Sequence, residues 1–567
     1  MIDKITKELS AYRDETVELF EGNNFSAYKL IRRIGLYKNQ IYPKGKFDSQ
    51  GNYKYWFDII SPRVSAEVKN IDFDTKNITL YSDSEQDSIK IILANAAMTE
   101  WMKETGQAEK INSAVEQGSE WGNVVWKKVK NDYKVLELNN LMVLNQTAKS
   151  LEDSDVIEYE TMLSTDLRRK VGVWSNVEEL IKSAKDNKKS APEFFIYERN
   201  GEVSEKEYYQ AKMLETKGEP KEGREDAYLL AKIIVGGVEK DKPMTVLFCD
   251  EISDKPYKEY HRSSYSGRWL RVGLYEALMD IQTRANEIGN QIARGLEWSS
   301  KTIFRSSDKV IAQNILTDLQ NGDIVKSVDL TQVNTRMEGL DQLIADWNRL
   351  MELADKIANS YEVVTGENSP AGTPFRLAAQ QNLNANKLFD FIREKLGLAL
   401  QDLVNDWILP DLLKNLKSRD IIRLTGDSGK LNTYYKAVVD AWYVKNLLAL
   451  PPHNEEIAKE LKEKKLQELL QNDEVKVQLE DDTWDDFKPR VRVVITGENT
   501  ILIEEMETLS TFIALEADPI RRTALIELAM KKKNIDVASL PKTAPQPIEQ
   551  PNEGNDAVKR QLKEFAK

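Results

Sequence analysis

The order of apolar and polar residues divides the chain into a mixed first part and a largely helical second part. Up to about residue 272, short apolar or alternating runs typical of strands are mixed with helical patterns. From Gly273, apolar residues recur at steps of three and four, which predicts a long amphipathic helix over 273–297. The same spacing returns over 335–360. These two helices enclose the interval 298–334, where KTIFR, an Asn-Gly turn and DIVKSV indicate a small strand-and-turn insert.

The segment after the second helix cannot continue it. Residues 361–375 contain two glycines and two prolines, and such a concentration of helix breakers predicts an irregular loop. The chain then has almost no breaker from Arg376 to Trp407. We therefore expect a very long helix that ends at Pro410.

Smaller elements are expected on both sides of this helical region. Those of the first part are a helix over 2–20, strands over 57–60, 66–71 and 78–81, one helix over about 86–117, a hairpin that turns at Asn131–Asp132, a helix over 167–184, and strands at FFIYER, YLLAKIIVGG and MTVLFCDEI. Those of the last part are strands at IIRL and VRVVIT and helices over 454–471, about 500–516 and 518–533. The fold class that follows is α+β and mainly helical.

Composition narrows the possible functions. The chain has 567 residues, a net charge of −13 and one cysteine, Cys249, so a disulfide framework is excluded. With only His261 and His453 beside that cysteine, a Cys/His zinc site cannot be assembled either. The acidic balance argues against a protein that grips nucleic acid along a basic groove, but not against one past which DNA slides. The first residues resemble neither a signal nor a transit peptide, so we expect a cytoplasmic location and no membrane partner.

Candidate catalytic and metal sites are weak. Asp58, Glu67 and Lys69 follow the spacing with which metal-dependent nucleases hold magnesium, but such loose spacing is common in a highly charged chain, and two solvated strand ends are the favoured interpretation. Residues 424–431, LTGDSGKL, lack the first glycine and the final Ser or Thr of a phosphate-binding loop and indicate a turn. The acidic run 480–486 lacks the spacing of a calcium loop. We expect no enzymatic activity and no cofactor.

Two glycine-containing segments and the order of the helices resemble a known family. Residues 266–291, SGRWLRVGLYEALMDIQTRANEIGNQ, are similar to the start of the first stem helix in portal proteins of tailed double-stranded DNA bacteriophages. Residues 114–129, AVEQGSEWGNVVWKKV, resemble the helix, glycine turn and strand of a portal wing. The similarity in order covers about 260–420 well, 1–260 and 420–500 loosely, and the C-terminal end hardly at all.

The resemblance implies a ring, usually of twelve subunits, at one vertex of the capsid. It assigns 1–272 to the wing, 273–297 and 335–360 to the stem helices, 298–334 to the clip, 361–375 to the tunnel loop, 376–499 to the long helix and the rest of the wing, and 500–567 to the crown. The implied partners are double-stranded DNA in the channel, the large subunit of the terminase, head-tail adaptor proteins and the major capsid protein. The implied location is the virion, after assembly in the host cytoplasm.

The resemblance also names candidate site residues. The tunnel-loop residues are Glu362, Thr365, Glu367, Asn368, Ser369, Pro370, Thr373 and Arg376. The clip residues that would dock partners are Lys301, Arg305, Lys309, Asp323 and Lys326. The acids proposed for the stem channel are Glu276, Asp280, Glu338 and Asp341. The two stem segments carry nine acids and five bases, a wall of −4 per chain that would repel phosphate.

Two other functions remain open at this stage. One is a metal-dependent nuclease or another enzyme associated with packaging, which requires activity that is lost with Glu67. The other is a helical scaffold that binds only proteins and forms no central channel.

Overall fold

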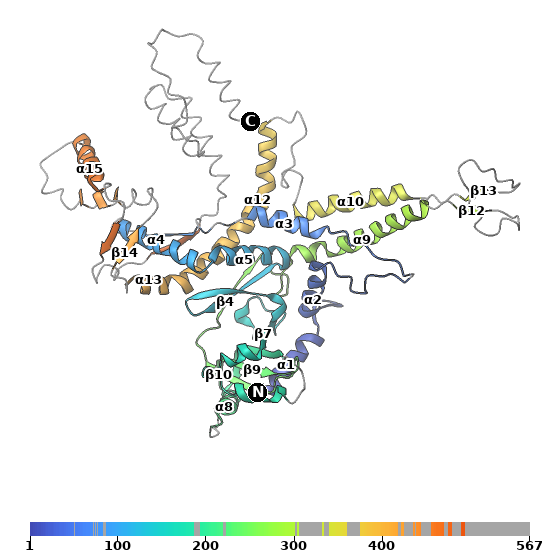
Figure 1. The fold of residues 1–567 in the computed structure, drawn as a ribbon, viewed down its shortest axis with the longest axis horizontal. Coiled ribbons are helices and arrows are strands. Elements are labelled where there is room, and N and C mark those ends of the chain that lie inside the picture. Colours follow the sequence, from blue (N-terminus) through green and yellow to red (C-terminus); the bar gives the residue numbers. More distant parts are fainter. Residues whose placement is uncertain are drawn as a thin grey trace, which may run out of the picture. The chain divides into compact units, whose positions relative to one another are not determined.

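The computed structural model confirms a mixed α and β protein (Figure 1). The chain divides into two units, Met1–Ile495 and Thr496–Lys567, and every described residue belongs to the first. The structure describes residues 1–185 (without 50, 72, 74, 76–77 and 83–86), 193–218, 223–300, 303–305, 331–333, 339–359, 375–417, 421–424, 435–443 (without 437 and 441), 455–469, 475–478 and 489–493. The helices expected over 500–516 and 518–533 and the acidic run 480–486 therefore lie outside the described residues.

An antiparallel sheet of five strands forms the lower part of the molecule in Figure 1. Its strand order is β10 (Thr245–Glu251), β9 (Tyr228–Gly237), β8 (Glu193–Ser204), β7 (Val156–Leu163) and β6 (Leu141–Val143). Successive side chains of a strand point to opposite faces. Accordingly Phe194 packs with α6 (Ser164–Arg168) and α7 (Val177–Lys185), whereas Tyr197 packs with α1 (Ile2–Asp14) and α8 (Glu205–Thr216).

A second sheet of three strands, in the order β11-β4-β5, lies above the first. β4 (Asn123–Val129) and β5 (Asp132–Leu136) form the predicted hairpin, and β11 (Tyr257–His261) pairs with the other edge of β4. The turn residues are Lys130 and Asn131, and Lys130 has a positive φ of 53°. β4 is buried on both faces, because Trp126 contributes to one hydrophobic core and Val125 to another.

A buried ion network joins the two sheets. The ammonium of Lys127 on β4 lies 2.5 Å from Glu158 on β7 and 2.7 Å from Glu198 on β8. Lys232 on β9 is 2.8 Å from Glu198. Burial alone would raise the pKa of Glu198, but the two lysines outweigh it and lower that pKa to about 2. The hydroxyl of Tyr257 on β11 completes the network by donating a hydrogen bond to Glu158 at 2.6 Å.

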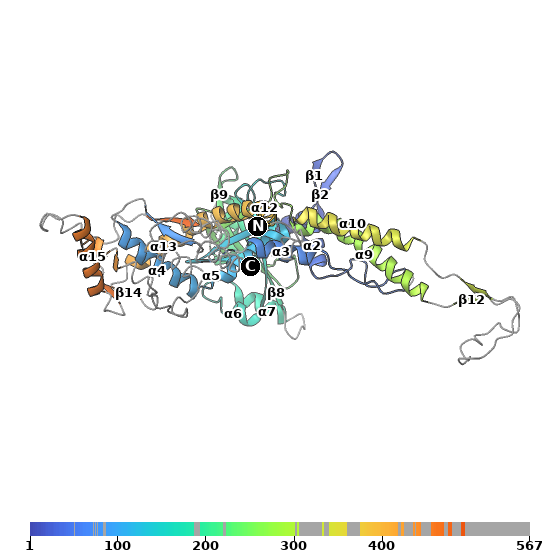
Figure 2. The ribbon, with the colours of Figure 1, turned by 90° about the horizontal axis from the view of Figure 1, so that it is seen from above.

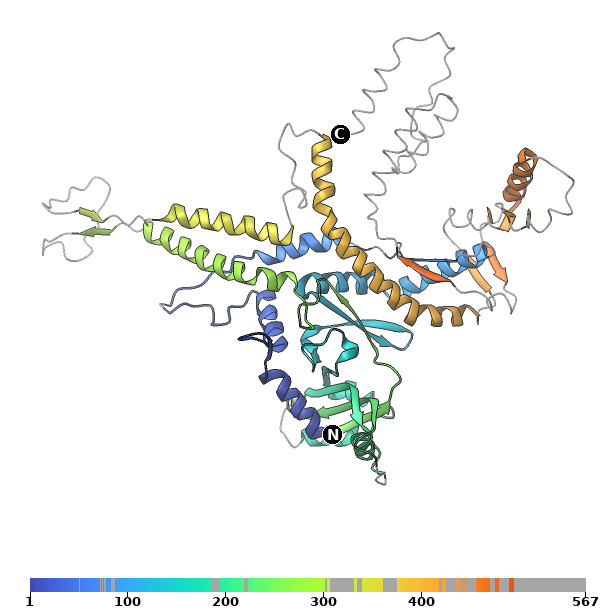
Figure 3. The same ribbon diagram turned by 180° about the vertical axis from the view of Figure 1, so that it is seen from behind.

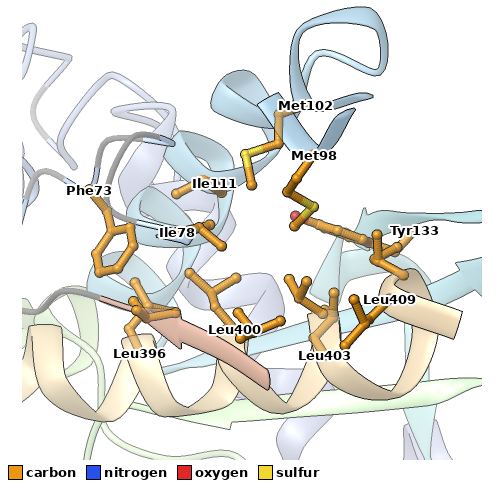
Figure 4. Close-up of a cluster of buried hydrophobic side chains, with 14 of the residues drawn as sticks. Phe73, Ile78, Met98, Met102, Ile111, Tyr133, Leu396, Leu400, Leu403 and Leu409 are labelled. Carbon is orange, nitrogen blue, oxygen red and sulfur yellow. The ribbon is translucent and has the colours of Figure 1, made fainter. Parts of the chain in front are cut away.

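The largest hydrophobic core joins segments from distant parts of the sequence (Figure 4). It contains residues of α4 (Ser88–Glu104), α5 (Gln107–Trp121), β4 and α12 (Phe375–Leu403), as well as of β3 (Ile78–Tyr81) and its partner β16 (Arg490–Val493). Figure 4 shows Leu396, Leu400 and Leu403 of α12 pointing toward Met98 and Met102 of α4. Through the antiparallel pair of β3 and β16, the last described residues of the chain contact a strand within its first hundred residues.

Residues 66–71, which were expected to form a strand, instead belong to a helix, α3 (Ile60–Ile71). Its buried residues, Ile60, Val64, Glu67 and Ile71, recur at steps of four, three and four, which is helical spacing. Pro62 does not break this helix because it lies in the first turn, where backbone N–H groups have no helical partner. The strand expectation for 66–71 is therefore wrong. Residues 57–59 precede α3 and form no strand, so the expectation for 57–60 is wrong as well.

Two predicted helices are interrupted. The single helix over 86–117 is two helices, α4 and α5, because Gly106 adopts a left-handed conformation with a φ of 64°. The helix over 167–184 consists of α6 and α7, joined by a segment that contains Gly172 at a φ of 92°. By contrast, α8 (Glu205–Thr216) was not predicted, although Ser204 and Glu207 form a capping box at its start.

Pro410 does not end the long helix. After α12 the chain makes a π-helical segment, Val404–Ile408, and continues as α13 (Leu409–Lys417). The wider turn precedes the proline, so Pro410 stands in the first turn of the next helical segment, where it is tolerated. Within the π segment, Asn405 accepts a hydrogen bond from the backbone N–H of Val491 on β16 at 3.1 Å.

The remaining elements are short or peripheral. They are β1 (Val17–Phe20), β2 (Asn23–Phe25), α2 (Ala27–Lys38), the 3-10 turns Leu138–Asn140 and Leu151–Asp153, and α15 (Glu455–Leu469), together with β14 (Ile421–Leu424) and β15 (Val475–Gln478), which pair antiparallel. The strand predicted at IIRL and the helix predicted over 454–471 correspond to β14 and α15. Among the described helices, none is long and apolar enough to cross a membrane.

The network around Lys127 makes stability depend on acidity. Because the pKa of Glu198 in the folded chain is below the value of about 4.3 expected for an unfolded chain, folding is stabilised above that value and loses this contribution as the pH falls toward about 2. Urea unfolding of the variant Lys127→Met should show a loss of about 3–5 kcal/mol at neutral pH, because two buried carboxylates lose their shared cation. The stability difference between parent and variant should shrink as the pH falls from about 4.3 toward 2, because only the parent still has this contribution to lose.

The matched control is Lys128→Met, since Lys128 is the next residue of β4 and is exposed. Equal stability curves for both variants would contradict the role given to the network.

Candidate functional site

The most distinctive feature of the described chain is a pair of long helices, α9 (Leu274–Ser299) and α10 (Leu340–Ala358), that pack along each other (Figures 1–3). Both helices predicted from the spacing are present, with ends that differ by a few residues. Beyond α9 and before α10, the strands β12 (Ile303–Arg305) and β13 (Thr331–Val333) pair antiparallel. A helical pair thus carries a small strand pair at the end where its two helices are connected.

Two glycines fix the start of α9. A Cβ atom on Gly273 would lie 2.4 Å from the carbonyl oxygen of Glu120 and 2.5 Å from the nitrogen of Gly122. Gly122 ends α5 with a φ of 84°, and its own Cβ would lie 2.7 Å from the carbonyl oxygen of Arg271. No side chain fits at either position, so only glycine lets the backbones approach this closely.

The side chain of Asn123 holds the segment that leads into α9. It accepts a hydrogen bond from the N–H of Arg271 at 2.7 Å and donates one to the carbonyl of Trp269 at 3.1 Å. Residues 114–129 and 266–291, the two segments that carry the family resemblance, therefore meet at this crossing.

A row of amide side chains along α9 binds an extended segment from the first part of the chain. Gln282, Asn286 and Asn290 are buried, and their side-chain oxygens accept hydrogen bonds at 2.8–2.9 Å from the N–H groups of Ile59, Phe57 and Tyr55. The amide groups of Asn290 and Gln282 donate to the carbonyls of Tyr55 at 2.9 Å and Phe57 at 2.5 Å.

The spacing of the two elements explains this match. Four residues of a helix rise about 6 Å, and two residues of an extended strand advance about 6.7 Å. Amides at every fourth position of α9 can therefore form hydrogen bonds with the backbone of every second residue of the segment. A neighbouring strand would bond to the same groups.

Aromatic side chains also pack the same segment between α9 and α10. Phe57 and Trp347 of α10 meet edge to face with ring centroids 5.3 Å apart. Both rings lie over Gly289 of α9, where a Cβ atom would be 2.5 Å from Phe57 and 2.9 Å from Trp347. A small residue is thus required at this point of α9.

Ion pairs add orientation to the helical pair. Arg63 of α3 lies 2.6 Å from Asp355 of α10 and donates a hydrogen bond to the carbonyl of Met351 at 3.2 Å. Arg284 of α9 lies 3.7 Å from Asp346 of α10. The position of α10 is therefore determined from α3 as well as from α9.

α10 carries two adjacent seams of mostly apolar residues. The first seam recurs at steps of four and three and consists of Leu340, Ile344, Trp347, Met351, Ala354 and Ala358. The second has the same spacing and consists of Leu343, Asp346, Leu350, Leu353 and Ile357. Its residues Leu353 and Ile357 are 44% and 38% exposed, whereas Ala354 and Ala358 are buried. In the second seam, Asp346 lies near Arg284 of α9 and Leu350 packs against the core, so the uncovered part of this seam is Leu353 and Ile357.

The acids proposed for the channel wall are not isolated charges. Glu276 accepts two hydrogen bonds at 2.7 Å from Arg268, and Asp280 lies 3.7 Å from Arg33 of α2. Arg33, Arg63 and Arg268 pair with acids of the two helices from outside them, and Asp48 pairs in the same way with Arg294 of α9. Including these three bases and one acid changes the count from −4 to −2 per chain. Asp341 is exposed, and Glu338 lies outside the described residues. The sequence count missed these partners because they belong to other elements.

The other predicted site residues are mostly outside the described part. Seven of the eight tunnel-loop residues lie outside the described part, and the eighth, Arg376, lies in α12. Of the clip residues, Lys301, Lys309, Asp323 and Lys326 are also outside, and Arg305 lies in β12. Nothing in the described chain brings these groups together.

The nuclease-like residues do not form a shared site. Glu67 is fully buried on α3, and its two oxygens accept hydrogen bonds from Arg262 at 2.8 and 2.7 Å. Lys69 stands two residues further along the same helix, a spacing that does not place side chains on one face. Asp58 caps the backbone of Ser61 at 3.1 Å. The expectation of two solvated strand ends is wrong for Glu67, which is a buried structural partner.

Metal-binding and nucleophilic chemistry find little support in the described residues. They contain no group of three His, Cys, Asp or Glu side chains close enough to hold a metal ion. Cys249 is buried on β10, and burial raises the pKa of its thiol to about 12. Searches of protein-family models and of curated proteins find no match for this chain.

Sequence reasoning missed the amide row, although a signal was present. Gln282, Asn286 and Asn290 lie four residues apart on a helix face that is otherwise apolar or small. Buried amides need partners, so such a row predicts a backbone segment opposite it.

Replacing two members of the row should release the extended segment. In the double variant Asn286→Leu/Asn290→Leu, the N–H groups of Tyr55 and Phe57 lose their acceptors. Hydrogen exchange at these two amides should become about tenfold faster or more, since a lost buried hydrogen bond costs about 1–3 kcal/mol. The control is Gln291→Leu, at an exposed neighbouring position. Retained protection in the double variant would mean that ring packing alone holds the segment.

Proposed function

We propose that this chain is a subunit of a ring-shaped portal through which double-stranded DNA enters and leaves the capsid of a tailed bacteriophage. The observation that carries the proposal is the helical pair α9–α10 with a strand pair between its helices, followed in the chain by α12 of 29 residues. In this proposal α9 and α10 form the stem, and the strand pair belongs to the clip that docks the terminase and later the adaptor proteins.

The second apolar seam of α10 supports an assembly of several copies. Leu353 and Ile357 have heptad spacing and face solvent in one chain, and exposed apolar stripes normally mark an interface. α12 adds Phe391 and Leu398, seven residues apart and 55% and 51% exposed. In a ring, each copy would pack such a face on a different patch of its neighbour, which gives a closed heterologous interface.

The charge of the proposed stem is compatible with DNA that passes along it without binding tightly. Since arginines from other elements pair with Glu276 and Asp280, and Asp48 pairs with Arg294, the repulsive wall inferred from the sequence is weakened to −2 per chain. A weakly acidic wall does not attract phosphate, so DNA can pass with little binding. Double-stranded DNA and the major capsid protein are proposed as partners because the resemblance to portal proteins implies them.

The first test is the oligomeric state. Native mass spectrometry of the purified chain should give an assembly near twelve copies of 65.0 kDa, although overexpressed rings can have neighbouring counts. The variant Leu353→Glu/Ile357→Glu should shift the chain to smaller species, because charge is placed in the proposed subunit contact. A matched control, Ala345→Glu/Asn348→Glu, adds the same charge at exposed positions outside the seam and should assemble normally.

Negative-stain images separate the alternatives. A ring with a central hole supports the portal, and an oligomer without a hole supports the scaffold. A monodisperse monomer at micromolar concentration would refute both. A packaging-associated nuclease would instead show magnesium-dependent cleavage, which the buried pairing of Glu67 with Arg262 does not favour at that residue.

The second test concerns the glycine- and proline-rich segment. Deleting Glu362–Pro374 and joining the flanking helices with a short glycine linker should leave assembly intact, because the deletion removes no apolar stripe. DNA packaging or retention should fail, which is measured as the amount of DNA protected in capsids. Loss of the oligomer would show that the segment is an assembly element and not a tunnel loop.

A further inference from the structure

One stretch of the chain has the opposite charge to the whole. Residues 26–56 contain seven Lys or Arg and a single acid, Asp48, within a protein of net charge −13. The same 31 positions hold seven aromatic residues. The stretch comprises α2 and the loop that leads to α3, and it runs from α2 along α9 (Figures 1 and 2).

Three of the four cations of α2 lie on its solvent-facing side, whereas Lys38 pairs with Glu120 at 2.8 Å. Lys29, Arg32 and Arg33 share the exposed face of this helix, opposite its buried apolar residues. Together with Arg13 they line a hollow of about 600 Å³ whose floor includes Tyr28 and Pro43. Its single acidic lining residue is Asp14. Arg13 pairs with Asp241 and Arg33 lies 3.7 Å from Asp280, so the positive potential of this hollow comes from Lys29 and Arg32.

A second hollow adjoins the first at Pro43. Its volume is about 420 Å³, and its lining includes Tyr42, Trp56, Lys44 and Lys54. Tyr42 and Trp56 meet edge to face at 5.0 Å, and the ammonium of Lys54 lies 4.7 Å from the Tyr42 ring. Arg294, Glu287 and the amides of α9 complete the wall.

The loop presents a row of exposed rings between lysines. Phe47 and Tyr53 form an antiparallel bridge, and their rings and that of Tyr55 contact in series at 5.8 and 5.4 Å. The three side chains are 62%, 47% and 55% exposed. In the described part of the chain, Lys44 and Lys46 have no ion-pair partner, and neither do Lys29 and Arg32. Large rings kept in solvent beside unpaired cations have no evident role in folding.

We propose that residues 26–56 form a binding surface for single-stranded nucleic acid. Unpaired bases stack on aromatic rings regardless of sequence, while lysine and arginine follow the phosphates. A duplex hides the faces of its bases, so it could use the cations but not the rings. The surface differs from the proposed DNA channel in its residues and its ligand, and it does not rest on the proposed ring.

The test is binding of a fluorescent oligothymidine of about 20 nucleotides to the full chain, measured by anisotropy at several salt concentrations. The parent should bind the oligomer more tightly than a duplex of equal length and more tightly than an abasic strand. The variant Phe47→Ala/Tyr53→Ala/Tyr55→Ala should weaken binding about tenfold or more, because stacking is lost. The variant Lys44→Gln/Lys46→Gln should reduce the slope of log K against log salt by about 1.4.

The control variant is Lys128→Gln/Lys182→Gln, which removes two exposed lysines elsewhere and should change nothing. Equal affinity for the abasic strand or for the duplex overturns the proposal, as does unchanged binding by the aromatic variant. Equal binding of polyglutamate, lost in the same variants, would identify the surface as one for acidic proteins and also overturn it. A change of oligomeric state in the Lys44→Gln/Lys46→Gln variant, seen by light scattering, would identify a subunit contact instead.

Discussion

The contact between Gly122 and Gly273 is the constraint on which the paired helices depend. With no Cβ on either residue, the end of α5 and the start of α9 touch through their backbones, and Asn123 fixes the segment between Trp269 and Arg271. The direction in which α9 leaves the core is therefore set at its first residue. The later contacts of α9, which are the amide row and the packing against α10, can form only if the helix leaves the core in that direction.

Helical and strand periodicity predicted the elements whose partners lie close in sequence or on one face. The two helices α9 and α10, the hairpin of β4 and β5, and the three long strands β8, β9 and β10 follow from residue spacing alone. The pattern was insufficient where a few residues decide the conformation. In α3 a buried glutamate, Glu67, stands on the otherwise apolar face, so the sequence pattern does not look helical. The glutamate can be buried there because Arg262, from a distant part of the chain, pairs with it.

The site was less predictable than the fold, because its key groups are supplied by distant parts of the chain. The arginines that neutralise the acids of α9 and α10 come from α2, α3 and residue 268, and no local pattern connects them. The overall charge likewise concealed a basic, aromatic stretch at 26–56. A count over the whole chain averages away such segments, whereas a count over windows of about 30 residues reveals this one.

The π-helical segment Val404–Ile408 has a consequence for how the chain can vary in length. A π turn contains one more residue than an α turn, so the segment amounts to a single inserted residue within an otherwise continuous helix. The insertion turns the following apolar residues, such as Leu412, back toward the core that α12 already faces. It also gives Pro410 a position without a clash against the preceding turn. A related chain that lacked the extra residue would therefore have to lack the proline as well, and the two should be gained or lost together in evolution.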